Sequence, residues 1–186
     1  MPKKVFPAGT ALYPTPVVLV SCADTGNSRN NIITVAWCGI VCSEPPLISI
    51  SLRPNRHSNR LIRETGNFVV NIPSKGLTEK VDHCGIVSGS DTDKFKSCSF
   101  TADKSSKVAS PLIRECPVNI ECLLKKTLTL GTHDMFIGEV VAVHVDYTIL
   151  NDKGSVDYHK AAPFVYNQGE YWDLGAKIGY HGYSRR

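Results

Sequence analysis

The stretch NIITVAWCGIVCSEPPLISISLRPNRHSN, residues 31–59, decides the fold of this chain. Its apolar run from Ile32 to Val41 predicts a strand, and two prolines (Pro45 and Pro46) then force a turn. Leu47 to Leu52 predicts a second strand, which ends in a basic, hydroxyl-rich loop leading to a helix. The stretch therefore places phosphate-type donors beside a hydrophobic wall.

Such a site suits a ligand with a flat apolar part and an anionic tail, and flavin mononucleotide (FMN) has this form. The isoalloxazine ring needs apolar surface on its faces and hydrogen-bond donors at its rim, which strand amides supply. We expect the rim to meet the amides of Thr34, Ala36, Trp37 and Cys38. We expect the phosphate to meet Ser51, Arg53, Ser58 and the first amides of the helix that begins near Ser58.

The same residues also fit a second interpretation. An ordinary buried hairpin followed by a helix with Ser58 as N-cap, and with its arginines in solvent, has the same spacing. Spacing alone leaves both interpretations open.

Further motifs occur in a fixed order along the chain: PTPVVLVSC (14–22), FVVNIP (68–73), CGIVSGSDTDKF (84–95), SPLIRECPVNIEC (110–122) and GTHDMFIGEVVAVHV (131–145). With these motifs the chain resembles the flavin reductase-like family from about Pro14 to Val145. The resemblance implies an antiparallel Greek-key split β-barrel, mainly β with a few short helices, that binds FMN as a homodimer. Residues and resemblance together predict a cofactor-binding set of Asn31, Thr34, Val35, Ala36, Trp37, Cys38, Ser51, Leu52, Arg53, His57, Ser58, Asn59, Ser88 and Lys94.

Two members of that set lie in the segment 83–95, whose glycines, serines and aspartates are typical of a plain surface loop. In the family, the corresponding positions lie by the cofactor. The resemblance therefore implies that Ser88 and Lys94 reach the phosphate or the ribityl chain, with lysine acting as a point charge.

His133 is the predicted catalytic residue. A histidine beside an acid, here Asp134, is also an ordinary turn feature. Similarity to the family's Gly-Asp-His pattern implies that His133 orients a reduced nicotinamide over the flavin. The chain has Thr132 where the family usually has Asp, which leaves the preference for NADH, NADPH or a protein donor open.

Length and composition predict one domain over residues 1–186, because 186 residues with 42% hydrophobic content can bury one substantial core. Residues 151–186 read as a C-terminal extension that packs on the barrel or on a partner subunit, where Trp172 or a nearby tyrosine could cap the flavin. The predicted strands are 17–23, 32–41, 47–52, 68–72, 118–130 and 135–150, the predicted helices are 58–64 and 77–83, and residues 101–111 read as a polar loop.

Seven cysteines form an odd set without a secretion signal, which indicates reduced thiols in a cytoplasmic protein. On a strand Cys38 and Cys42 would lie roughly 13 Å apart, so no metal site is predicted. The net charge of +4 is spread out, which argues against nucleic acid as a partner. The N-terminal residues contain no long apolar run, so neither a signal peptide nor a membrane anchor is expected.

Two classes of function are consistent with these residues and motifs. The first is an oxidoreductase that moves electrons through flavin N5, from NAD(P)H or a redox protein partner to flavin, ferric or protein acceptors. The alternative is a flavoredoxin-type electron carrier or a non-catalytic module that binds or senses flavin. The sequence has no GxSxG, GxxxxGK[ST], HExxH or GxGxxG motif to support another chemistry.

Overall fold

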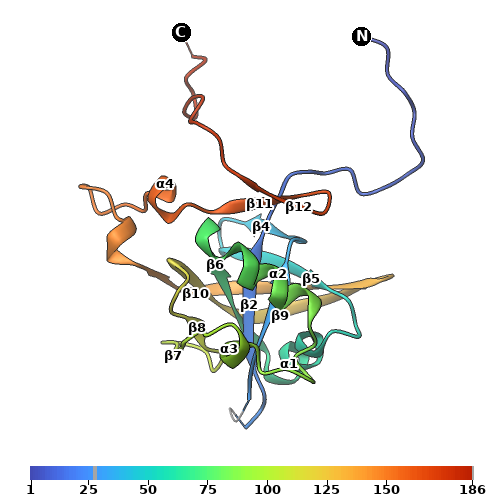
Figure 1. Ribbon diagram of the computed structural model, residues 1–186, viewed down its shortest axis with the longest axis vertical. Coiled ribbons are helices and arrows are strands. Elements are labelled where there is room, and N and C mark those ends of the chain that lie inside the picture. Colours follow the sequence, from blue (N-terminus) through green and yellow to red (C-terminus); the bar gives the residue numbers. More distant parts are fainter. Residues whose placement is uncertain (27–28, 186) are drawn as a thin grey trace.

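The computed structural model describes residues 1–26 and 29–185 and is mainly antiparallel β-structure (Figure 1). Within these residues, seven strands form one sheet in the order β3-β2-β6-β9-β10-β5-β4. The strands are β2 (Val18–Ala23), β3 (Asn30–Val35), β4 (Cys38–Cys42), β5 (Leu47–Leu52), β6 (Asn67–Ile72), β9 (Val118–Leu130) and β10 (His133–Val145). The predicted fold class, mainly β and antiparallel with a few short helices, is confirmed.

β3 and β4 lie at opposite edges of this sheet, although only Ala36 and Trp37 separate them along the chain. The sheet therefore curls until the end of β3 lies near β5, and the Ser51 amide donates to the Trp37 carbonyl (2.8 Å). The prediction of one strand from Ile32 to Val41 is wrong, because the chain breaks at Ala36 and Trp37 to pass from one edge to the other.

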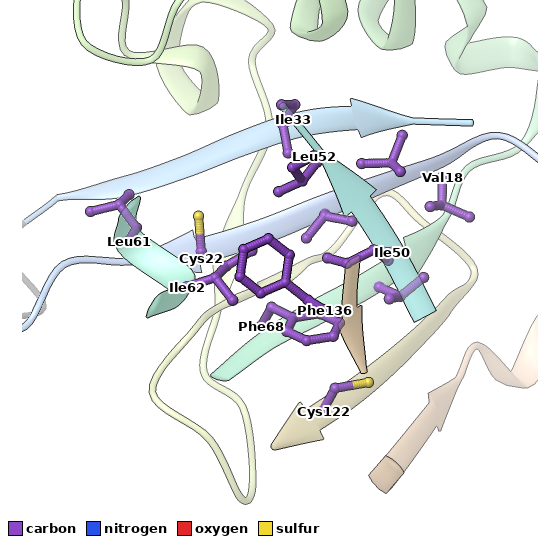
Figure 2. Packing of buried hydrophobic residues seen from close by; sticks show 13 residues of the cluster. Val18, Cys22, Ile33, Ile50, Leu52, Leu61, Ile62, Phe68, Cys122 and Phe136 are labelled. Atoms are coloured by element: carbon purple, nitrogen blue, oxygen red, sulfur yellow. The ribbon is translucent and has the colours of Figure 1, made fainter. Parts of the chain in front are cut away.

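Two phenylalanines pack among aliphatic side chains and cysteines in the core of the barrel (Figure 2). Phe68 and Phe136 are fully buried, and Leu61 and Ile62 of α1 (His57–Thr65) pack in the same cluster. Gly138 makes this packing possible, because a Cβ there would lie 2.6 Å from the Phe68 ring. The absence of a side chain at Gly138 thus lets the Phe68 ring pack against β10.

The remaining short elements correct the sequence-based boundaries. The helix predicted at 77–83 is a 3-10 turn, η1 (Lys75–Leu77), followed by α2 (Thr78–Ile86). The segment 83–95, one reading of which was a plain surface loop, includes the end of α2 and the start of α3 (Lys94–Ser97). Helix α3 is capped by the Asp93 carboxylate, which accepts the Lys96 amide (3.1 Å).

Two further predicted boundaries are wrong. The last long strand ends at Val145 rather than at Leu150, because Asp146 caps a 3-10 turn, η2 (Tyr147–Ile149). The supposed polar loop 101–111 begins with β7 (Ala102–Asp103), which pairs with β8 (Leu112–Ile113).

The C-terminal residues join the N-terminal ones in a separate small sheet. Its strands are β1 (Thr15–Pro16), β11 (Phe164–Asn167) and β12 (Glu170–Asp173), in the order β1-β11-β12, and the short helix α4 (Tyr158–Ala161) precedes β11 along the chain. Both termini extend from this end of the molecule in Figure 1. Among the described residues, no helix is long and apolar enough to cross a membrane.

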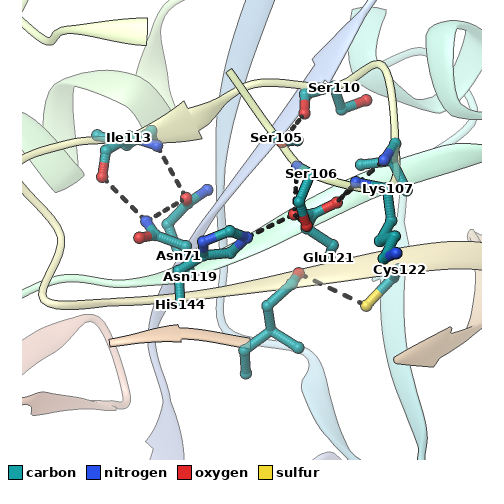
Figure 3. Close-up of polar contacts among 12 residues, drawn as sticks. Asn71, Ser105, Ser106, Lys107, Ser110, Ile113, Asn119, Glu121, Cys122 and His144 are labelled. Carbon is teal, nitrogen blue, oxygen red and sulfur yellow. Dashed lines mark hydrogen bonds and ion pairs between the residues drawn. The ribbon is translucent and has the colours of Figure 1, made fainter. Parts of the chain in front are cut away.

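Glu121 on β9 is fully buried and ties a loop to the barrel (Figure 3). Its carboxylate accepts hydrogen bonds from the amides of Ser106, Lys107 and Val108, and it pairs with His144. Burial alone would raise the pKa of Glu121, but these donors outweigh burial and lower the pKa to about 2. The ionised carboxylate therefore stabilises the folded state.

Replacing this carboxylate by an amide, Glu121→Gln, should lower the free energy of unfolding at pH 7 by about 1 to 3 kcal/mol, because buried donors lose their charged acceptor. The pKa of Glu121 is lower in the folded chain, so its stabilising contribution is present above pH 4.5 and is lost as the pH falls towards about 2. Urea unfolding across this range should give a flatter pH dependence for the variant.

A matched control is Glu64→Gln, since Glu64 lies on the exposed face of α1 in an ion pair with Arg60. This control should change the free energy of unfolding by less than about 0.5 kcal/mol. Equal losses in the two variants would contradict the assignment.

Candidate cofactor-binding site

A cavity of about 490 Å³ lies where the end of β3 meets the end of β5, and we call it the split cavity. It combines apolar side chains and strand amides with the cationic side chains of Arg53 and Arg56. Its lining residues are Val17, Ile33, Thr34, Val35, Ala36, Trp37, Ser51, Leu52, Arg53, Arg56, Gly85, His133, Tyr166 and Tyr171. It can receive a flat, largely apolar group with a polar rim.

A second cavity of about 200 Å³, the anion pocket, shares Ile33 and Arg56 with the split cavity. Its lining residues are Asn31, Ile33, Asn55, Arg56, His57, Ser58, Val87, Ser88, Gly89 and Lys94, and none of these described residues is acidic. Because they share these residues, the two cavities are neighbours.

Lys94 is the buried cation of the anion pocket, which the Arg56 side chain also lines. The Lys94 side chain is 2% exposed, and its Nζ donates to the Cys84 carbonyl (2.8 Å). In the part of the chain that the structure describes, Lys94 has no ion pair with a carboxylate. Burial lowers the pKa of Lys94, and the nearby positive charge of Arg56 lowers it further. A buried cation in this state is costly, and a bound anion would offset that cost.

Asn31 contributes a second unsatisfied group. Its Nδ2 donates to the Ser58 hydroxyl (2.7 Å), whereas its buried Oδ1 has no partner among the described residues. Gly89 lies directly against it, because a Cβ on Gly89 would lie 2.0 Å from that oxygen. A buried acceptor without a donor is rare, and a ligand hydroxyl that reached this oxygen would satisfy it.

Helix α1 points its N-terminus into the same pocket. Its N-cap, Arg56, makes no side-chain cap, and no acid lies in the first turn, so the helix dipole favours an anion there. The helix begins at His57, and Ser58 is a buried helical residue rather than the N-cap. Burial lowers the pKa of His57, and the positive charges of Arg60, Arg29 and Lys94 act in the same direction.

The structure brings most of the predicted residues together, in two groups. The split cavity holds Thr34, Val35, Ala36, Trp37, Ser51, Leu52, Arg53 and His133. The anion pocket holds Asn31, His57, Ser58, Ser88 and Lys94. Ser51 and Arg53 were expected at the phosphate together with Ser58. They line the split cavity instead, whereas Ser58 lines the anion pocket.

Two predicted residues lie in neither cavity. The side-chain amide of Asn59 donates to the Asp134 carboxylate (2.9 Å) and to the Leu52 carbonyl (3.4 Å). These hydrogen bonds link α1 to the sheet. Cys38 lines a third cavity, and Trp37 also contributes to the lining of that cavity.

The predicted cofactor-binding set omits several lining residues, of which Tyr166 and Tyr171 are the most distant along the chain, although a tyrosine near Trp172 was expected over the flavin. They reach the split cavity because β11 pairs with β1 and with β12, and their rings pack together at 6.1 Å. The aromatic composition of the tail was the available signal. Trp172 does not line the cavity, and its Nε1 donates to Glu170 (2.8 Å).

His133 stands opposite Trp37 in the split cavity. The two rings are nearly parallel, at an interplanar angle of 10° with centroids 6.5 Å apart. The neighbouring Asp134 is buried and pairs with Arg63 (2.9 Å), which anchors the start of β10. Bonds to Arg63 and then to Asn59 lower the pKa of Asp134, so it remains a carboxylate.

The described residues contain no group of three or more His, Cys, Asp or Glu side chains arranged to hold a metal ion. The cysteines are free thiols, and Cys38 and Cys42 stand at the two ends of β4.

A split barrel with a polar-rimmed cavity at the split and a cationic pocket beside it defines a class of cofactor-binding domain. Residues 10–175 match the family model described as flavin reductase like domain, and the chain belongs to this family. The family resemblance and the split-barrel fold predicted from the sequence are thereby confirmed.

Known proteins with high similarity support the same conclusion. The flavoredoxin of Desulfovibrio vulgaris (Miyazaki F) is 37% identical, with a TM-score of 0.92 and coverage of 99% of this chain and 100% of its own. The flavoredoxin of Methanosarcina acetivorans is 29% identical, with a TM-score of 0.89 and coverage of 98% and 97%. An uncharacterized Archaeoglobus fulgidus protein is 31% identical over 79% of this chain and 81% of its own length.

The anion pocket predicts a specific response to inorganic phosphate. Phosphate should raise the thermal unfolding temperature of the wild type, because an anion that binds only the folded chain stabilises it. Lys94→Met should lose most of this increase, whereas Lys96→Met, which changes an exposed lysine on the same helix, should keep it. A full phosphate response in Lys94→Met would contradict the assignment of this pocket.

Proposed function

We propose that this chain binds FMN and acts as an oxidoreductase. The ring would occupy the split cavity, and the phosphate would occupy the anion pocket. The buried charge of Lys94, which pairs with no described carboxylate, carries this proposal. A phosphate dianion is a suitable counterion, and the N-terminus of α1 and the Ser58 hydroxyl add donors for it.

The split cavity fits the other end of the cofactor. Trp37 and Tyr166 offer aromatic surface, and the strand break at Ala36 and Trp37 frees main-chain groups from regular pairing on one side. The unpartnered Asn31 oxygen suits a hydroxyl of the ribityl chain between ring and phosphate. A bound flavin supplies the redox chemistry by accepting or releasing electrons at N5, and the chain supplies binding and orientation.

The electron donor we favour is NADH or NADPH. Arg53 and Arg56 line the split cavity and would attract the phosphates of a pyridine nucleotide. His133 would help to place the nicotinamide ring over the flavin, since alignment matters more than proton transfer for this step. The second candidate is a flavoredoxin-type carrier with a redox protein partner, which the similarity to two flavoredoxins supports.

We further propose a cytoplasmic homodimer. Ile40 is 86% exposed and Val41 is also exposed on β4, which is an edge strand of the barrel sheet. An apolar edge of this kind is usually covered by a partner, and a second copy of the chain is the simplest one. Free thiols in all seven cysteines fit a reducing compartment.

Two substitutions test the placement of the cofactor. Ser58→Ala and Lys94→Met should each weaken FMN binding by about 1 to 3 kcal/mol, because each removes a donor to the charged phosphate in the anion pocket. Titration of the flavin-free protein with FMN, followed by fluorescence, measures this change. Ser155→Ala, in an exposed turn, is the control and should bind FMN as the wild type does. Unchanged affinity in both test variants would remove the assignment.

Anaerobic reduction separates the two candidate functions. NADH or NADPH should bleach the flavin absorption of the wild type, and His133→Ala should keep its flavin while being reduced more slowly. Yellow protein that neither nucleotide bleaches, but that reduced ferredoxin does, would favour the carrier. Loss of flavin from His133→Ala would show instead that His133 belongs to the cofactor-binding set.

A further inference from the structure

A third cavity, of about 450 Å³, lies beside the split cavity and shares Ala36, Trp37 and Ser51 with it. The N-terminal residues 9–13 form one wall, and Met135 and Gly39 contribute to the rest. We call it the neutral cavity, because none of the described residues that line it carries a charged side chain. The neutral cavity thus differs in charge from the split cavity, which is lined by Arg53 and Arg56.

The walls of the neutral cavity favour a flat aromatic molecule. Tyr13 and Trp37 meet edge to face, with centroids 6.5 Å apart and an interplanar angle of 72°. Trp37 remains 38% exposed although it stands between two cavities. An aromatic surface without nearby cations binds planar uncharged groups and offers nothing to a phosphate.

The Thr15 hydroxyl gives the cavity a polar group that needs a hydrogen-bond partner. The Thr15 hydroxyl oxygen is buried without a hydrogen-bond partner among the described residues, and Thr15 lines this cavity. A buried hydroxyl without a partner is costly, so a ligand that accepts its hydrogen bond would be stabilised. A carbonyl oxygen at the edge of a planar ring is such an acceptor.

We propose that the neutral cavity binds an uncharged quinone. The size of the cavity is within the range of small-molecule sites. Reduction of a quinone to its hydroquinone takes two electrons and two protons, the number that a fully reduced flavin releases on oxidation. Electron transfer from the flavin to the quinone therefore rests on the proposed function. Binding of the quinone in this cavity does not.

Gly39 allows the cavity to be filled without disturbing the backbone. A Cβ on Gly39 would meet no atom within 4 Å, and its φ is not in the left-handed region. Gly39→Phe should weaken the binding of duroquinone to the oxidised, FMN-loaded protein at least tenfold, as measured by equilibrium dialysis. Duroquinone is a suitable probe because its fully methylated ring gives cysteine thiols no open position to attack.

Two further variants sharpen the test. Gly175→Phe adds the same side chain at an exposed glycine that lines none of the three cavities, and it should bind duroquinone as the wild type does. Thr15→Val keeps the shape but removes the hydroxyl, and it should weaken binding severalfold. FMN content, measured separately by absorbance, should be the same in all four proteins.

Several outcomes would overturn the proposal. These are no measurable binding of duroquinone to the wild type, equal binding to Gly39→Phe, and displacement of FMN by duroquinone. Competition by anthraquinone-2-sulfonate would equally contradict an uncharged ligand. If the chain as purified takes up no FMN but binds duroquinone in a Gly39-dependent way, the proposed flavin function fails and the assignment of this cavity stands.

Discussion

The buried ammonium group of Lys94 is the constraint on which the proposed cofactor site depends. Folding removes it from water, and the structure provides it with the Cys84 carbonyl but with no described carboxylate. Neighbouring features, the Ser58 hydroxyl and the N-terminus of α1, have the same preference for an anion. The simplest reason for assembling donors in one small pocket is a permanent anionic ligand, whose binding also stabilises the fold.

The junction at Ala36 and Trp37 determines where that ligand can extend. Because the chain crosses there from one edge of the sheet to the other, the barrel has a split beside Ser51. Trp37 then lines two cavities of different chemistry, one with cationic residues and one without. A single interruption of a strand thus places the split cavity and the neutral cavity on either side of one tryptophan.

The sequence predicted those features whose signals are local. Strand-sized runs and the order of family motifs predicted the barrel, and the motif residues from Asn31 to Lys94 largely line the two cavities. It could not predict the break in the first long strand, because Ile32 to Val41 is largely apolar, and the break follows from the pairing of β3 with β2 and of β4 with β5. Tyr166, the role of Gly89 and the burial of Lys94 depend on contacts between distant segments, which no local pattern records.

A crystal structure of the protein grown with FMN tests the placement of the cofactor most directly. We expect the phosphate within ion-pair distance of Lys94 Nζ, at the N-terminus of α1, and the ring in the split cavity beside Trp37. A phosphate in solvent, or a ring seated in the neutral cavity while Lys94 remains without an anion, would contradict this placement.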